Sequence, residues 1–120
     1  MSRDLRNGAD RARAELAMSL TGYALDVPLG ELRGATRGST DAAFARQAAM
    51  YLSHVAFGMS LARVAAAFQR DRSTVAHACH VMEDRRDDAG FDAWLEALEA
   101  SARSAPQPQI ATLSGLGRAA

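Results

Sequence analysis

Two short apolar stripes, separated by a polar turn of three to four residues, constrain the fold of this 120-residue chain more than any other feature. The first stripe is formed by Leu61, Val64, Ala65 and Phe68. The second is formed by Val75, Ala78, Cys79 and Met82. In both, the residues stand at i, i+3, i+4 and i+7, which is one complete apolar face of an α-helix. The pattern predicts two short helices that pack through these faces around a tight turn, the layout of a helix-turn-helix.

The second of these helices is predicted from Arg72 to about Arg86, with Asp71 as its N-cap. Its polar side chains, His77 among them, fall on the face opposite the apolar stripe. Arg70 and Arg72 stand at its entrance, where positive charges can meet phosphates. An exposed polar helix start beside two arginines fits a recognition helix that enters the major groove of DNA.

Helical spacing of apolar residues predicts further helices over residues 9–24, from Thr40 or Asp41 to Gly58, and over residues 91–98. The first helix is expected to lose regularity near Gly22, residues 29–34 are interpreted as a turn and residues 34–40 as a loop, and no strand pattern appears. The prediction is an all-α helical bundle in three parts. They are an N-terminal helical extension (1–23), a helix-turn-helix domain (24–100) and a flexible C-terminal tail (101–120).

The chain carries fourteen basic residues, all of them arginine, against fourteen acidic ones, so its net charge at pH 7 is zero. These charges are unevenly distributed. Between Arg33 and Arg72 there are six arginines and two acidic residues, whereas residues 83–99 hold seven acidic residues and two arginines. A chain polarised in this way can present a basic face to a phosphate backbone. Arg85 and Arg86 stand among the acids at a helix end, where local salt bridges are expected rather than DNA contacts.

Other classes of protein find little support in the sequence. There is no apolar run of the ~20 residues that a membrane helix needs and no signal peptide, so a cytoplasmic protein without membrane contact is expected. His77, Cys79 and His80 would diverge around a helix, whereas structural zinc needs four converging ligands, so no metal site is predicted. No phosphate loop of the form G-x-x-x-x-G-K-[ST], paired carboxylates or nucleophile–base pair occurs, which argues against bound nucleotide, another cofactor or an enzyme.

The run ARQAAMYLSHVAFGMSLARVAAAFQRDRSTVAHACHVMEDRR, residues 45–86, resembles the C-terminal DNA-binding domain, domain IV, of the bacterial replication initiator DnaA. The pattern of that family runs approximately P-R-Q-x-A-M-Y-L, then S-L-x-x-I-G-x-x-F, then G-R-D-H-T-T-V-x-H-A. Residues from about Ala24 to Arg86, and in part as far as Leu98, fit this module. The resemblance implies a TrpR-like helix-turn-helix that binds double-stranded DNA.

The resemblance also implies roles for individual residues. The positions that would read bases in the major groove are Asp71, Arg72, Ser73, Thr74 and His77. The positions that would contact phosphate or the minor groove are Arg33, Arg37, Arg46, Gln47 and Arg70. In the family the positions of Arg46 and Gln47 grip phosphate, and an arginine in the loop before the long helix enters the minor groove. Arg37 is the first choice for that arginine and Arg33 the second.

The chain departs from the family pattern in several places. Arg72 replaces a histidine and Ser73 a threonine, Ala45 replaces the proline before Arg46, and the turn after Phe68 is one residue shorter. The nucleotide-binding AAA+ module of the initiator has no counterpart in this sequence, so an initiator ATPase is not expected.

The expected function is therefore sequence-specific binding of double-stranded DNA at initiator-box-like sites, by a nucleoid-associated regulator of replication initiation or transcription. The alternative is a protein-interaction adaptor that keeps the fold, has little DNA affinity and contacts the replication initiator or its inactivator. DNA binding with a steep salt dependence favours the first function, and absence of binding at low salt favours the second.

Overall fold

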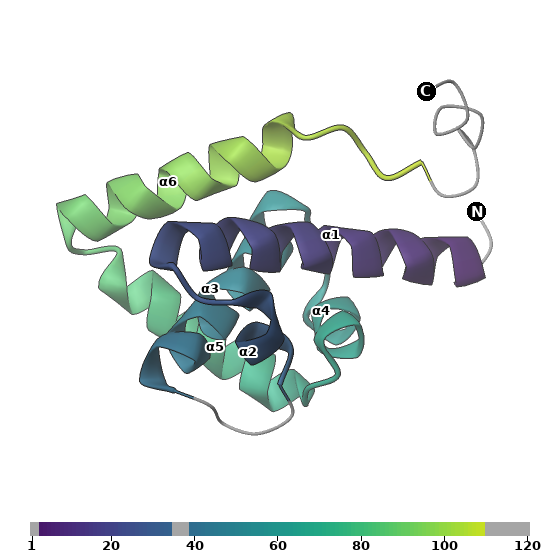
Figure 1. The fold of residues 1–120 in the computed structure, drawn as a ribbon, viewed down its shortest axis with the longest axis horizontal. Helices are drawn as coiled ribbons and strands as arrows, with labels where there is room; N and C mark the ends of the chain where they lie inside the picture. Colours follow the sequence, from purple (N-terminus) through teal and green to yellow (C-terminus); the bar gives the residue numbers. More distant parts are fainter. Residues whose placement is uncertain (1–2, 35–38, 110–120) are drawn as a thin grey trace.

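A computed structural model describes residues 3–34 and 39–109, and within these ranges the chain forms six α-helices and no strand (Figure 1). The helices are α1 (Arg3–Leu25), α2 (Leu29–Arg33), α3 (Thr40–Ala56), α4 (Leu61–Phe68), α5 (Arg72–Arg85) and α6 (Ala89–Ser104). The prediction of an all-α fold is confirmed. No helix of the described ranges is long and apolar enough to span a membrane.

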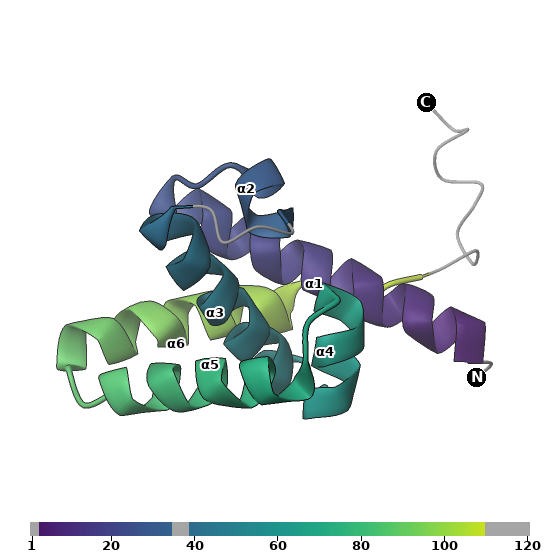
Figure 2. The same cartoon turned by 90° about the horizontal axis from the view of Figure 1, so that it is seen from below.

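Helix α3 occupies the centre of the bundle and packs against each of the other five helices. Four of its fully buried residues are Ala42, Ala45, Ala48 and Ala49, whose small side chains let neighbouring helices approach closely. Helices α1 and α6 run along one side of the bundle in Figure 1, and α4 and α5 meet at one end of it in Figure 2. Helix α5 thus packs on a central helix that contacts every other helix.

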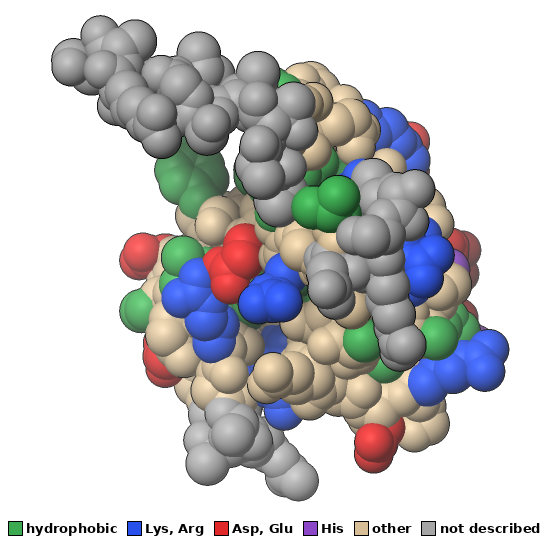
Figure 3. All heavy atoms as spheres, turned by 90° about the vertical axis from the view of Figure 1, so that its right-hand side faces the viewer, with side chains coloured by type: hydrophobic (Ala, Val, Ile, Leu, Met, Phe, Trp, Pro, Cys, Tyr) green, Lys and Arg blue, Asp and Glu red, His purple; other side chains and the backbone are tan. Residues whose placement is uncertain are grey.

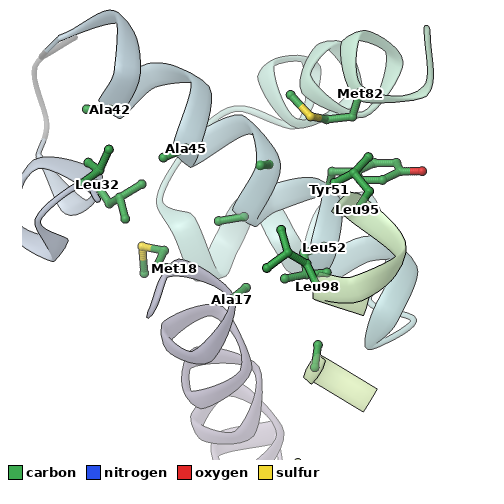
Figure 4. Close-up of a cluster of buried hydrophobic side chains, with 14 residues drawn as sticks. Ala17, Met18, Leu32, Ala42, Ala45, Tyr51, Leu52, Met82, Leu95 and Leu98 are labelled. Atoms are coloured by element: carbon green, nitrogen blue, oxygen red, sulfur yellow. The ribbon is translucent and has the colours of Figure 1, made fainter. Parts of the chain in front are cut away.

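The buried apolar side chains form two clusters. The main core lies between α1, α2, α3, α5 and α6 and includes Met18, Leu32, Tyr51, Leu52 and Met82 (Figure 4). The second cluster, the helix-turn-helix core, consists of Met50, Met59, Val64, Ala65, Val75 and Ala78. The predicted apolar stripes of α4 and α5 therefore do meet, and methionine side chains complete their core.

Helix α1 does not break at Gly22, contrary to the sequence prediction, and continues to Leu25. The chain reverses through Asp26, which has a left-handed φ of 55°, and returns so that the backbone N–H of Val27 donates to the carbonyl of Gly22 at 2.9 Å. A Cβ atom at Gly22 would lie 2.8 Å from the carbonyl oxygen of Val27. The glycine therefore permits the close return of the chain and does not end the helix.

The stretch predicted to be a turn is the five-residue helix α2. Pro28 precedes it with an extended backbone (φ −61°, ψ 141°), and Leu32 is buried in the main core. A helix this short has too few residues to show a periodic pattern in the sequence.

Two hydroxyl side chains begin the helices that lead to the candidate site. The hydroxyl of Ser39 accepts a hydrogen bond (3.1 Å) from the backbone N–H three residues further on, so Ser39 caps α3 and not Thr40 or Asp41. Ser60 caps α4 in the same way, with its hydroxyl accepting from the backbone N–H of Arg63 at 3.2 Å.

Helix α6 is longer than predicted. The carboxylate of Asp88 accepts a hydrogen bond from the backbone N–H of Phe91 at 2.8 Å and starts the helix. The helix continues to Ser104, past Ser101, at which a flexible tail is predicted, because Ala102 is buried in the main core.

Candidate nucleic-acid interface

The turn between α4 and α5 consists of Gln69, Arg70 and Asp71. Gln69 adopts the left-handed conformation (φ 55°, ψ 49°) that ends many helices. Its backbone N–H donates to the carbonyl of Ala66 at 3.3 Å, and that of Arg70 donates to the carbonyl of Ala65 at 3.0 Å. With the apolar faces of both helices buried against each other, the predicted helix-turn-helix is confirmed.

The predicted base-reading residues lie at the start of α5 on its solvent face, and all of them are exposed: Asp71, Arg72, Ser73, Thr74 and His77. Asp71 takes the N-cap position, but its side chain makes no capping hydrogen bond. In the described parts of the chain, no hydrogen bond or ion pair engages the side chains of Arg72 and His77. The structure brings these groups together on one surface and leaves them free to bind a ligand.

Arg46, predicted to grip phosphate, is only 7% exposed. Its Nε donates to the carbonyl of Leu32 at 2.9 Å and its Nη2 to the carbonyl of Glu31 at 3.1 Å, so the side chain fastens α2 to α3. Burial, together with the nearby positive charge of Arg70, lowers the pKa of Arg46. Gln47 beside it is half-buried. Arg46 therefore has a structural role in joining two helices, and the sequence predicted only a phosphate contact for it.

Arg70 and Arg46 share a hollow of about 210 Å³. The Nη2 of Arg70 donates to the carbonyl of Gly34 at 2.6 Å and ties the turn to the end of α2. Among the described residues, neither arginine forms an ion pair with a carboxylate. A carbonyl carries no net charge and does not neutralise a guanidinium as a carboxylate would, so the hollow between the two arginines is suited to an anion.

The two arginines considered for the minor groove are in different situations. Arg33 is exposed and forms a two-point ion pair with Glu15 of α1, with its Nε 3.1 Å from a carboxylate oxygen. Arg37 lies outside the described residues. Arg33 would have to exchange its carboxylate partner for DNA in order to contact it.

Helix α1 is joined to α4 by an ion cluster that the sequence does not reveal. Asp10 is buried, and its carboxylate accepts hydrogen bonds from Nε (2.9 Å) and Nη2 (2.6 Å) of Arg63 and from Nη1 of Arg13 (3.1 Å). The hydrogen bonds from Arg63 hold the pKa of Asp10 below its ordinary value, against the opposing effect of burial. Because Asp10 and Arg63 are far apart in the sequence, no local pattern predicts that they pair.

A second polar network lies at the C-terminal end of α5. The Nη1 of Arg86 donates to the hydroxyl of Tyr51 (3.1 Å) and to the carboxylate of Glu99 (3.0 Å), and its Nε pairs with Asp92. The hydroxyl of Tyr51 donates to Glu83 at 2.6 Å, and burial raises its pKa to about 12. The expectation of local salt bridges is confirmed for Arg86. It is wrong for Arg85, whose guanidinium lies over the rings of Phe44 and Phe91 and forms no ion pair with the described residues.

Comparisons with known proteins agree with this geometry. The family model of the bacterial DnaA protein helix-turn-helix matches residues 16–81. Chromosomal replication initiator protein DnaA 1 of Protochlamydia amoebophila (strain UWE25) is 34% identical over 85 residues, which are 69% of this chain and 19% of that protein. A solved structure described as the crystal structure of a DNA replication initiation factor matches with a TM-score of 0.73 at 25% identity, over 83% of this chain and 31% of that one.

The chain thus spans about a fifth of the curated relative and under a third of the solved protein. The matched residues begin inside α1 and include the whole of α4 and most of α5. A match over more than half of the chain, together with the helix-turn-helix geometry, identifies the family. The chain belongs to the family of the bacterial DnaA helix-turn-helix, a DNA-binding fold.

Proposed function

We propose that this protein binds double-stranded DNA at initiator-box-like sites and thereby regulates replication initiation or transcription. The observation that supports this best is the exposed and uncommitted row of polar side chains at the start of α5. A buried network would hold such groups in fixed contacts, whereas a reading surface needs them free.

Four of the five groups in this row, those other than Ser73, have a matching feature on a base edge. The fork of donors on Arg72 suits the O6 and N7 acceptors of guanine, and the free carboxylate of Asp71 can accept from the amino group of cytosine. The hydroxyl of Thr74 can bind either a donor or an acceptor, and the imidazole of His77 has two ring nitrogens that can bind base edges. Four side chains with different preferences on one face would favour particular base sequences over others.

The phosphate contacts would come from the arginines beside this row. Arg46 and Arg70 have N–H groups beyond those that bind carbonyls, and both line the same hollow. Arg33 and Arg37 are assigned to the minor groove or its flanking phosphates, where A·T-rich sequence narrows the groove and makes its potential more negative. These contacts would set the register of the protein on the duplex, and α5 would read the sequence.

Selection of bound sequences from a random duplex pool tests the proposal, followed by affinity measurements on the selected site over a range of salt concentrations. We expect one enriched motif and an affinity that falls steeply with salt. Arg72→Ala should weaken binding and relax the motif, whereas Arg103→Ala, at an exposed arginine on α6, is the matched control and should change neither. If no motif is enriched and no duplex is bound at low salt, the adaptor function replaces this one.

A further inference from the structure

A groove with several arginines runs between α1 and the turn of the helix-turn-helix. Two hollows, of about 440 and 210 Å³, share Arg11, Ala67 and Gln69 in their walls and therefore adjoin. The larger lies between α1 and α4, and the smaller contains Arg46 and Arg70. Figure 3 looks onto the end of the molecule at which α1 begins, where arginine side chains gather around a hollowed surface.

Arg11 is the residue of α1 that lines both hollows. Asn7 lines the larger and Glu15 the smaller, and the three stand four residues apart on one face of the helix. This face of α1 is directed at the groove. Asn7, Arg11 and Glu15 all precede residue 16, at which the match to the family model begins.

The positive charge of Arg11 is unopposed. Its side chain is exposed, and within the described ranges no hydrogen bond or ion pair engages it. The two acidic residues that line the groove are already committed, Asp10 to Arg63 and Glu15 to Arg33. The groove therefore presents a free guanidinium at Arg11 and, at Arg46 and Arg70, two guanidinium groups that bind carbonyls and have no carboxylate partner among the described residues.

We infer that Arg11 binds a phosphate of the DNA backbone beside the site read by α5, so that the N-terminal half of α1 forms part of the DNA interface. This inference rests on the proposed function. A small anion would fill one hollow, whereas a nucleic-acid backbone supplies charges in series and can occupy both. The ion pair of Arg63 with Asp10 holds α1 against α4, so the helix that carries Arg11 is already in place before DNA binds.

The test compares four variants, Arg11→Ala, Arg11→Lys, Arg6→Ala and Arg70→Ala, with the wild type on a duplex that carries the selected site with extended flanks. Arg11→Ala should lower the slope of log affinity against log salt by about 0.9, the value for one phosphate contact on duplex DNA. Arg11→Lys restores a positive charge and should recover most of that slope. Arg6→Ala is the matched control, because Arg6 is also an exposed arginine of α1 but lines neither hollow, and its slope should equal that of the wild type.

The outcomes separate this inference from the proposed function. If Arg11→Ala binds like the wild type while Arg70→Ala loses affinity, the inference is overturned and the proposed function stands. An equal loss for Arg6→Ala and Arg11→Ala would also overturn it, because the effect would then be one of total charge. If the wild type binds no duplex at low salt, both fail. Unfolding curves verify that each variant is folded. Alanine and lysine both have high helix propensity, so these substitutions on an exposed helix face should preserve the fold.

Discussion

The guanidinium of Arg63 grips the carboxylate of Asp10 with two hydrogen bonds, at 2.6 and 2.9 Å, and this pair joins the first helix of the chain to the first helix of the helix-turn-helix. Arg13 adds a third hydrogen bond to the same carboxylate and then reaches Gln107 near the C-terminal end of the described residues, at 3.0 Å. These hydrogen bonds fasten α1 to the helix-turn-helix.

Asp10→Asn should lower the free energy of unfolding at neutral pH by about 1 to 3 kcal/mol, the range for hydrogen bonds to charged groups. The pKa of Asp10 in the folded protein lies below its ordinary value of 3.8. The ionised carboxylate of Asp10 therefore makes its full contribution to the free energy of unfolding above pH 3.8. This contribution is lost as the pH falls through the lowered pKa of Asp10. Urea unfolding of both proteins from neutral to acidic pH checks this. The two stabilities should converge in acid, and a gap that stays constant would contradict the assignment.

Arg46→Ala should affect both affinity and stability. Loss of one phosphate contact should reduce affinity for all duplexes alike and shrink the salt slope by about one. Loss of the donors to Leu32 and Glu31 should also destabilise the fold, by about 1 to 3 kcal/mol, because a buried carbonyl is left unsatisfied. Arg70→Ala removes a donor to only one carbonyl and is the comparison. If Arg46→Ala alters stability but not the salt slope, Arg46 is a purely structural residue.

Arg72→His restores the residue that the family pattern has at this position and should change the selected motif at one base pair. Arg72 favours guanine, and a good bidentate contact is worth about 1 to 3 kcal/mol of discrimination between bases. Binding selections on the wild type and the variant give the comparison directly. Identical motifs that differ only in strength would mean that Arg72 clamps a phosphate and does not read a base.

Glu15→Gln should strengthen DNA binding. The substitution removes the carboxylate that holds Arg33, and it removes a negative charge from the groove that Arg11 lines. The salt slope should grow by about one if Arg33 then contacts phosphate. Affinity measurements on Glu15→Gln and on the double variant Glu15→Gln, Arg33→Ala test whether the released Arg33 causes the gain. The double variant should lose the part of the gain that Arg33 supplies, and a double variant that binds as tightly as the single one would place Arg33 outside the interface.

Arg86→Ala should destabilise the protein by about 3 kcal/mol, because it leaves the buried carboxylate of Glu99 without its positive partner. Arg85→Ala is the control. The guanidinium of Arg85 lies 4.7 Å from the ring centres of Phe44 and Phe91, an arrangement worth about 1 kcal/mol at exposed sites. Thermal unfolding of the two variants should show the larger loss for Arg86. Equal losses would mean that the network contributes no more than the ring contacts.

The elements around the recognition helix could be predicted from the sequence because their signals are local. Apolar residues at helical spacing predicted both α4 and α5, and the structure has both helices. Among the three adjacent residues Ser39, Thr40 and Asp41, any side chain could serve as the cap of α3, and the sequence alone could not select one.

The remaining features depend on residues that are distant in the sequence. Arg46 is buried because the carbonyls of Leu32 and Glu31 lie next to it in the folded chain. Arginine usually lies on the surface, so the residue type alone does not predict this burial. The pairing of Asp10 with Arg63 and of Arg86 with Glu99 likewise requires the packed helices. The exposure of the α5 residues was predictable, because the opposite face is apolar at regular intervals.

The two cores are not separate units. Phe57, Phe68 and Cys79 pack against both clusters, and Met50, which completes the helix-turn-helix core, belongs to the central helix α3. Loosening of the recognition helix would therefore expose apolar surface in the rest of the bundle, so the molecule should open as one cooperative unit. Residues 60–86 are consequently not a portable module: transplanted into another protein without α3, they would lose part of the core that holds their two helices at the angle needed to reach DNA.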